Sequence, residues 1–374
     1  MTTPLHVRGV FLPHDDEERD LWIVEGRLTF GPVPGAETIA AGGWVIPGLV
    51  DGHCHIGLGP AGPVHDPAEL HDQARADAAG GALLVRDAGS PADTRFLDDE
   101  DDAPRIIRCG KHIARPKRYS PNTALEIEPP ELAEVVLKEA SGGGPAAVGG
   151  DAPCGEAHPW VKLIGDWIDR SEGDMTPLWP ADALREAVGR AHAAGARVAV
   201  HVFGEEALPD LLDAGVDSIE HGTGLTEDLV ARLADSGAAL VPTLINLDNF
   251  PGIAESARAK FPVYAERMVR LHGTARARIR AAYEAGVPIY CGTDAGGGIT
   301  HGRVVDEIIA LHEAGLPADA ALGAGSWAAR DWLGQPALEE GAPADLLVCD
   351  SDPRTELSAL RSPVRIVLRG RILA

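Results

Sequence analysis

The first residues whose types and spacing indicate chemistry are His53 and His55, which follow the apolar, glycine-containing segment 47–52. In a β-strand, residues i and i+2 project to the same face, so both imidazoles point together while Cys54 points away. Imidazole is a common ligand of zinc and related ions. A histidine pair at this spacing is more often two unremarkable polar residues, so a metal site needs further ligands elsewhere in the chain.

Further residues that could bind a metal lie in or directly after other apolar runs: Lys162, His201, His221 and Asp294. Taken singly, each has a plainer interpretation as a hydrogen-bonded core histidine, a lysine that reaches solvent or pairs with an acid, or a turn aspartate. Six such residues at the same end of a set of parallel strands would instead form one metal site. The sequence therefore predicts a shared site rather than six separate coincidences.

The segments that carry these residues alternate with helical patterns, which is typical of βα units and a parallel sheet. We expect eight strands, near residues 45–55, 83–87, 105–109, 161–164, 198–202, 217–221, 239–243 and 288–294. Eight is the strand number of a (β/α)8 TIM barrel, an α/β fold whose active sites lie at the carboxyl ends of the strands. All six candidate ligands would then lie at that rim.

Helices are expected between the strands, for example over residues 181–194 and 275–285, each of which is followed by glycine. Two segments look less regular. Residues 142–150 form a Gly/Ala-rich stretch, and residues 246–262 contain Pro251, Gly252 and Pro262. We expect the first segment to be a loop and the second, which follows the seventh strand, to be irregular.

Short strand-like runs occur at both ends of the chain. Residues 21–24 and 28–30 flank a glycine turn and predict a hairpin, and residues 344–349 and 364–369 read as strands near the C-terminus. We therefore expect a small β-sandwich domain formed from both termini, residues 1–46 with 335–374. The barrel would occupy residues 47–334.

Composition limits the classes of partner. The chain has 374 residues and a formal net charge of −24, which argues against nucleic acid or an anionic membrane as a partner. It has neither a run of eighteen apolar residues nor an N-terminal signal pattern, and its five cysteines form no CxxC pair. We expect a cytoplasmic protein that acts on a small molecule, and homo-oligomerisation stays open.

Several stretches in combination resemble the amidohydrolase superfamily, in particular its imidazolonepropionase-like and prolidase-like branch: residues 47–55, 161–163, 198–204, 217–222, 292–296 and 341–348. The resemblance covers nearly the whole chain. It implies a barrel with a β-sandwich made from both termini, in agreement with the strand pattern. It also implies a divalent metal centre of two zinc ions.

The resemblance also implies a role for each candidate ligand. His53 and His55 are similar to the strand-1 ligands, His201 and His221 to the ligands of the second ion, and Asp294 to the aspartate that binds the first ion and moves protons. Lys162 resembles the lysine that becomes carbamylated and bridges both ions. Carbamylation would replace a buried ammonium with an anion.

Two details of the resemblance bear on the reaction. Imidazolonepropionases proper use one metal and lack the bridging lysine, so Lys162 favours the binuclear, peptidase-like members. Ring deaminases usually carry a glutamate at the position of Gly204, so ring deamination is disfavoured.

The expected activity is cleavage of a C–N bond, amide or peptide-like, in a dipeptide, N-acyl amino acid or cyclic amide. Metal-activated hydroxide would attack the carbonyl carbon, and Asp294 would pass the proton to the leaving nitrogen. The same chemistry would serve a lactone or ester hydrolase. A non-catalytic barrel scaffold is the alternative from another class, although such a scaffold is expected to lose ligands and none is missing here.

A further set of residues would contact the substrate. Arg118, in the basic segment 111–119, could bind a substrate carboxylate or could instead pair with Asp166 and Asp169. His112 and His301 resemble histidines that assist catalysis in some relatives. The remaining candidates for the pocket wall are Tyr119, Trp167, Asn246 and, more weakly, Tyr264.

Overall fold

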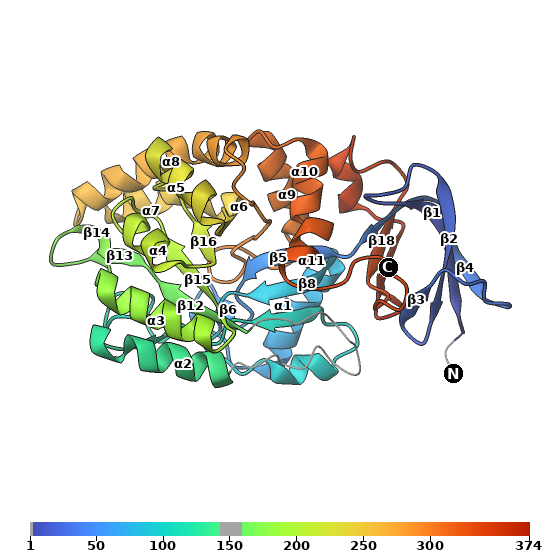
Figure 1. The fold of residues 1–374 in the computed structure, drawn as a ribbon, viewed down its shortest axis with the longest axis horizontal. Coiled ribbons are helices and arrows are strands. Elements are labelled where there is room, and N and C mark those ends of the chain that lie inside the picture. Colours follow the sequence, from blue (N-terminus) through green and yellow to red (C-terminus); the bar gives the residue numbers. More distant parts are fainter. Residues whose placement is uncertain (1–2, 143–158) are drawn as a thin grey trace.

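The computed structural model describes residues 3–142 and 159–374. A larger part made of parallel strands and helices lies beside a smaller β-sheet, and the two chain ends meet at that smaller sheet (Figure 1). The predicted loop 142–150 lies almost entirely outside the described residues. Among those described, no helix is both long and apolar enough to span a bilayer.

The parallel strands of the larger part include the first seven that the sequence predicts: β5 Leu49–Cys54, β8 Ala82–Asp87, β9 Arg105–Arg108, β12 Trp160–Ile164, β15 Arg197–Val202, β16 Ser218–His221 and β17 Ala239–Val241. Two further parallel strands, β10 His112–Ala114 and β11 Ala124–Glu126, were not predicted. β5, β8 and β9 form one sheet, and β11, β10, β12, β15, β16 and β17 form another, each in that spatial order. Apart from those of β11, most residues of these strands are buried, as expected for a parallel sheet covered by helices.

The predicted eighth strand is not a regular strand, and this corrects the prediction for residues 288–294. Isolated parallel bridges join Ile289 to Leu240 and Ala295 to Cys54, so the segment links β17 back to β5. Between the bridges, the Thr293 N–H donates to the Asp51 carboxylate at 3.0 Å rather than to a neighbouring strand. At Thr293, the Asp51 side chain therefore replaces the backbone acceptor that a neighbouring strand would supply.

The helices surround these strands (Figure 1). They are α1 Pro67–Ala79, α2 Leu132–Gly142, α3 Ala181–Ala193, α4 Leu208–Ala214, α5 Glu227–Ser236, α6 Leu244–Leu247, α7 Phe250–Ala257, α8 Pro262–Glu284, α9 Val304–Glu313, α10 Ala318–Ala324 and α11 Trp327–Trp332. Local signals set several ends. In α5, the Thr226 hydroxyl caps the first turn, and Gly237 ends the helix in the left-handed region, where glycine has no Cβ penalty.

The region after β17 differs from the prediction. Residues 246–262, expected to be irregular, contain the end of α6 and all of α7, and α8 starts at Pro262 rather than near residue 275. Pro251 and Pro262 misled the prediction because both occupy the first turn of a helix, where the missing N–H costs nothing.

The smaller part is one seven-stranded sheet from both termini, in the order β20-β19-β18-β4-β1-β2-β3. Its strands are β1 Leu5–Phe11, β2 Glu18–Val24, β3 Arg27–Thr29, β4 Glu37–Pro47, β18 Leu346–Cys349, β19 Arg365–Leu368 and β20 Arg371–Ile372. The predicted hairpin is β2–β3. β4 joins both ends of the chain by pairing with β1 and β18. The layering that would make this sheet a sandwich stays a prediction.

Two short hairpins complete the strands, β6 Leu58–Gly59 with β7 Gly62–Pro63 and β13 Asp166–Asp169 with β14 Asp174–Pro177. β13 begins two residues after β12 ends, so the second hairpin projects from the same strand ends as the candidate ligands.

Candidate metal centre

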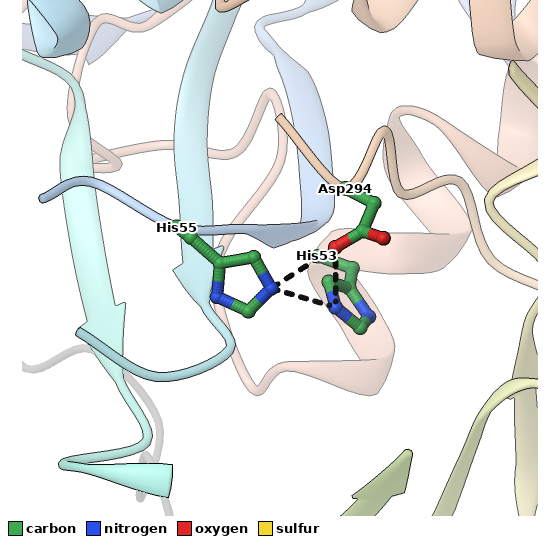
Figure 2. Close-up of side chains that lie close together, drawn as sticks. All are labelled: His53, His55 and Asp294. Carbon is green, nitrogen blue, oxygen red and sulfur yellow. Dashed lines mark hydrogen bonds and ion pairs between the residues drawn. The ribbon is translucent and has the colours of Figure 1, made fainter. Parts of the chain in front are cut away.

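Three of the predicted ligands converge at one point (Figure 2). His53 Nε2 lies 3.2 Å from His55 Nε2, and Asp294 Oδ1 lies 3.2 Å from the first nitrogen and 3.0 Å from the second. His53 and His55 are on or directly after β5, and Asp294 lies in the segment that bridges back to β5. Ligand atoms bound to one ion at about 2.0–2.1 Å are separated by roughly 3.0–3.4 Å, so the spacing fits one metal ion.

The hydrogen bonds of the two imidazoles support a cation at this point. His55 Nδ1 lies 2.8 Å from the Gly89 carbonyl oxygen, which can only accept, so this nitrogen carries the proton. His53 Nδ1 lies 2.6 Å from Glu220 Oε2. With both Nδ1 atoms protonated, the two Nε2 lone pairs and Asp294 Oδ1 face one another, and none of these three side chains supplies a proton to the contact. A metal ion between these three atoms would accept a lone pair from each of them.

A second group lies beside the first. His221 Nε2 lies 3.0 Å from His201 Nδ1, and the His53 and His221 rings are 5.1 Å apart. Lys162 Nζ lies 3.5 Å from His53 Nε2. Within the described part of the chain, no carboxylate lies within ion-pair distance of Lys162 Nζ. The six predicted ligands therefore meet in one place, with Lys162 beside the first group.

Electrostatics in the centre follow from burial and crowding. Burial lowers the pKa of Lys162, and Glu220 and Asp294 offset part of that effect. Burial would raise the pKa of Asp294, but the neighbouring histidines hold it well below its ordinary value. Burial, with His221 close by, depresses the pKa of His201 well below its ordinary value. Neutral imidazoles and an ionised carboxylate are the forms that bind metal.

The backbone at three strand ends adopts an unusual conformation. His221, Thr243 and Asp294 have φ values of 68°, 50° and 58°, in the left-handed region that favours glycine. The Thr243 hydroxyl also lies 2.7 Å from His221 Nδ1. Local strain of this kind persists where the surrounding structure fixes it, often at functional sites.

Several other predicted site residues lie against this centre. Asn246 Nδ2 donates to Asp294 Oδ2 at 2.5 Å. The His112 ring lies 5.0 Å from the His55 ring, and its buried Nε2 has no hydrogen-bond partner among the residues that the structure describes. Tyr119 packs between His112 and Trp167, and Trp167 also contacts His201. Aromatic side chains therefore form one wall of the centre.

Arg118 does not face the centre as a free cation. Its Nη1 donates to Asp169 at 3.1 Å, and its Nη2 donates to the carbonyl oxygens of Trp167 and Thr176, both at 2.9 Å, and to the Thr176 hydroxyl. The structure therefore supports the alternative pairing with Asp169 over the binding of a substrate carboxylate. The guanidinium braces the β13–β14 hairpin.

His301 is also committed elsewhere. Its Nδ1 lies 2.8 Å from Asp77 Oδ2 on α1, and Asp77 Oδ1 accepts the Gly302 N–H at 2.8 Å. Burial would lower the pKa of His301, but the charge and hydrogen bond of Asp77 raise it. Within the described residues, His301 makes no direct contact with His53, His55 or Asp294. It fixes the loop after Asp294 to α1.

The sequence reasoning missed the buried polar residues that support the ligands: Asp51, Arg86, Glu220 and Thr293. Asp51 accepts the N–H of His53 at 3.1 Å and the Thr293 hydroxyl at 2.5 Å. Burial raises the pKa of Asp51 to about 7. One signal was available, because the charged residues Asp51 and Glu220 lie two positions before His53 and one position before His221, in the strands that carry these predicted ligands.

Comparison with known proteins identifies the family. The amidohydrolase family profile matches residues 160–373, more than half of the chain. The chain belongs to the amidohydrolase family. It is 53% identical over 367 residues, 98% of this chain and 95% of the other, to an uncharacterized protein of Mycobacterium tuberculosis strain H37Rv. As an amidohydrolase, it is a hydrolase of C–N bonds.

Solved structures show the same fold. A Xaa-Pro dipeptidase with bound methionine aligns with a TM-score of 0.78 and 20% identity, covering 99% of each chain. A putative prolidase from Bifidobacterium longum aligns with a TM-score of 0.79 and 21% identity, covering 99% of this amidohydrolase and 94% of that chain. The amidohydrolase therefore has a mixed α/β fold of the TIM-barrel type, and its structural neighbours include prolidase-like members, as its motifs predicted.

Proposed function

We propose that this amidohydrolase is metal-dependent and cleaves an amide or peptide-like C–N bond of a small molecule. Dipeptides, N-acyl amino acids and cyclic amides are the substrate classes. The observation that carries this proposal is the convergence of six side chains from five separate segments of the chain, namely His53, His55, Lys162, His201, His221 and Asp294. The fold likeness to a dipeptidase and a putative prolidase supports a peptide-like substrate.

The proposed cofactor is a pair of divalent ions, zinc by preference. His53, His55 and Asp294 would hold the first ion and His201 and His221 the second, with carbamylated Lys162 between them. When bound, such ions supply Lewis acidity toward a carbonyl and make water more acidic. The depressed pKa of Lys162 favours carbamylation, because the neutral amine is the form that reacts with carbon dioxide.

The residues of the chain itself perform the remaining steps. Asp294 is the proposed general base and then acid, which carries one proton from water to the leaving nitrogen. Asn246 holds the second carboxylate oxygen of Asp294 in place. His112, with its free Nε2, is the proposed partner of the substrate carbonyl oxygen. Tyr119 and Trp167 would pack on the substrate.

We also propose the larger organisation that the sequence predicts. Residues 47–334 form the (β/α)8 barrel, and residues 1–46 with 335–374 form a β-sandwich beside it. Support comes from the strand series that bridges back to β5 and from the sheet shared by both termini. The proposed setting is the cytoplasm, with neither nucleic acid nor membrane as partner.

The first test measures metal and turnover together. The purified protein is analysed for bound metal, stripped with a chelator, reloaded with zinc or manganese, and screened against dipeptides, N-acyl amino acids, cyclic amides and lactones. We expect about two ions per chain and C–N hydrolysis that chelation abolishes. Turnover of lactones alone would make the protein an ester hydrolase instead. Metal-independent turnover would contradict the proposal.

The second test concerns Asp294. Asp294→Asn keeps an oxygen ligand but cannot accept the proton, so kcat should fall by about 10²–10⁴-fold while metal is retained. Undiminished hydrolysis with full metal content would remove Asp294 from the mechanism.

A further inference from the structure

We propose that Glu220 is a positioning residue for the metal centre, which acts with Arg86 to fix the His53 imidazole with its Nε2 lone pair toward the ion. The inference concerns residues outside the predicted ligand set. It rests on the proposed function for its purpose, although its geometry is independent of whether a metal is bound.

The contacts of Glu220 are specific. Its Oε2 lies 2.6 Å from His53 Nδ1, and its Oε1 accepts the Ser218 hydroxyl at 2.5 Å. Arg86 Nη2 donates to both oxygens, at 2.8 and 2.9 Å. Ser218 and Glu220 share one face of β16 because they are two residues apart, and Arg86 comes from β8. The Glu220 side chain is 0% exposed.

The pattern of donors fixes the tautomer of His53. Arg86 and Ser218 supply donors to Glu220, so the carboxylate acts as an acceptor toward both. A carboxylate held in this way needs a donor from His53 as well, and the proton must therefore sit on Nδ1. His53 Nε2 is left as a lone pair, 3.2 Å from Asp294 Oδ1 and 3.5 Å from Lys162 Nζ. Glu220 thus prepares one ligand atom of the centre.

Arg86 is itself held from several sides. Its guanidinium lies over the Trp160 ring at 4.5 Å and the Trp332 ring at 4.7 Å, and its Nε donates to the Gly52 carbonyl oxygen at 2.7 Å. Gly52 precedes His53 on β5. Arg86 therefore supports His53 in two ways. It holds Glu220, which contacts the His53 ring, and it holds the Gly52 carbonyl oxygen, which belongs to the backbone next to His53. Cation–π contacts help to offset the cost of burying this charge.

A purely structural role would not need this arrangement. A buried ion pair can often be replaced by apolar residues with no loss of stability. Arg105–Asp345 offers a comparison within the same chain, since it is a buried pair with a 2.7 Å contact from Nε to Oδ2. Among the described residues, neither side chain of this pair hydrogen-bonds to a predicted metal ligand. The two pairs can therefore separate a role in metal binding from a role in folding.

The first experiment reads the tautomer in metal-free protein. In Glu220→Gln, the amide oxygen should stay with Arg86 and Ser218, which leaves the NH2 group facing His53 Nδ1. His53 would then carry its proton on Nε2. Nitrogen-15 NMR of histidine-labelled protein at pH 8 should show His53 protonated on Nδ1 in the wild type and on Nε2 in the variant. An unchanged Nδ1–H tautomer in the variant would overturn the proposal.

The second experiment measures metal affinity by competition with a chromophoric chelator. Loss of a carboxylate that orients a histidine ligand typically weakens metal binding 10–100-fold, and we expect that range for Glu220→Gln with zinc. The first ion, at His53, should be lost at lower chelator concentration than in the wild type. Wild-type affinity in a folded variant would contradict the inference.

A paired variant guards against misfolding. Arg86→Met with Glu220→Met removes both charges, so neither is left buried alone. The matched control is Arg105→Met with Asp345→Met. We expect only the first pair to weaken zinc binding at least tenfold, whatever its Tm, and equal zinc affinity in the two double variants would refute the role.

The outcomes also separate this inference from the proposed function. If the wild type binds no divalent metal, the proposed function fails, yet the tautomer of His53 still tests the role of Glu220. If the wild type binds metal and Glu220→Gln changes neither tautomer nor affinity, only the inference fails.

Discussion

At the scale of single residues, the centre depends on which atom of each side chain faces inward. His55 presents Nε2 because its Nδ1 is hydrogen-bonded to the Gly89 carbonyl oxygen, and His53 presents Nε2 because its Nδ1 is hydrogen-bonded to the Glu220 carboxylate. Asp294 presents Oδ1 to both rings and Oδ2 to Asn246. Each orientation is set by a second hydrogen bond from a neighbouring segment. Substitutions of those neighbours should therefore affect activity without removing any ligand.

Asn246→Ala tests this at Asp294. The variant removes the donor to Oδ2, and a hydrogen bond to a charged group contributes about 1.5–3 kcal/mol. We expect kcat to fall roughly 10-fold or more while the metal content stays at the wild-type level, measured by steady-state kinetics and elemental analysis. Unchanged kcat would mean that Asp294 is held by its other contacts alone. Asn249→Ala, which removes only a contact to Asn246 Oδ1, should have the smaller effect.

At the scale of elements, strand ends position the ligands and the segments beside them brace the site. The β13–β14 hairpin brings Trp167 against His201, and Arg118 holds that hairpin together. The loop after Asp294 is fixed to α1 by His301 and Asp77. Both contacts are partly buried polar interactions whose loss should affect the shape of the site.

Arg118→Met should loosen the hairpin. We expect the free energy of unfolding to fall by about 1.5–3 kcal/mol in denaturant titration, since donors to Asp169 and two carbonyl oxygens are lost. Because the Arg118 guanidinium is engaged by Asp169 and by the carbonyl oxygens of the hairpin, kcat/KM should fall alike for substrates with and without a carboxylate. A loss restricted to carboxylate substrates would restore the carboxylate-binding hypothesis.

Asp77→Asn should show a characteristic pH dependence. Asp77 raises the pKa of His301, so its stabilising effect is full below the ordinary histidine value of about 6.5 and is lost as pH rises through the raised pKa. The variant should be less stable than the wild type by about 1–3 kcal/mol at pH 6, and by less at pH 9, in urea titrations. Asp72→Asn, at a side chain that is 74% exposed, is the control. A difference independent of pH would contradict the ion pair.

At the scale of the whole molecule, the chain closes on itself through the terminal sheet. β4 runs directly into β5, which carries His53, and β18 pairs with β4 from the opposite end of the chain. Leu346, Val348 and Val367 pack in the core of this sheet. The sheet therefore supports the first ligand strand without contributing a ligand.

Leu346→Ala tests that support. The Leu346 side chain is 0% exposed. Truncation of a buried leucine to alanine lowers the free energy of unfolding by about 2–5 kcal/mol. We expect a loss of that size in thermal and urea unfolding, with kcat/KM unchanged at temperatures where the variant is folded. Val263→Ala, at a position 57% exposed, should change stability by no more than about 0.5 kcal/mol. Loss of activity in fully folded Leu346→Ala would show that the sheet shapes the site directly.

The sequence by itself determined the order of strands and the residues available as ligands, because both are local. Apolar runs of strand length predict strands wherever they lie, and His53 with His55 share a face through their spacing alone. These local features predicted which residues could form the metal centre. Proline signals are also local, but they gave a wrong expectation at Pro251 and Pro262. Proline can occupy the first turn of a helix as well as interrupt one, and the sequence does not separate the two cases.

Only the tertiary structure decided how polar side chains pair, because partners for a buried charge come from distant segments. Arg118 could have faced a substrate or Asp169, and 51 residues of chain separate the pair that formed. Arg86 and Glu220 lie 134 residues apart and meet His53 from two other strands. Burial makes each such group require a partner, but the identity of that partner depends on which strands become neighbours.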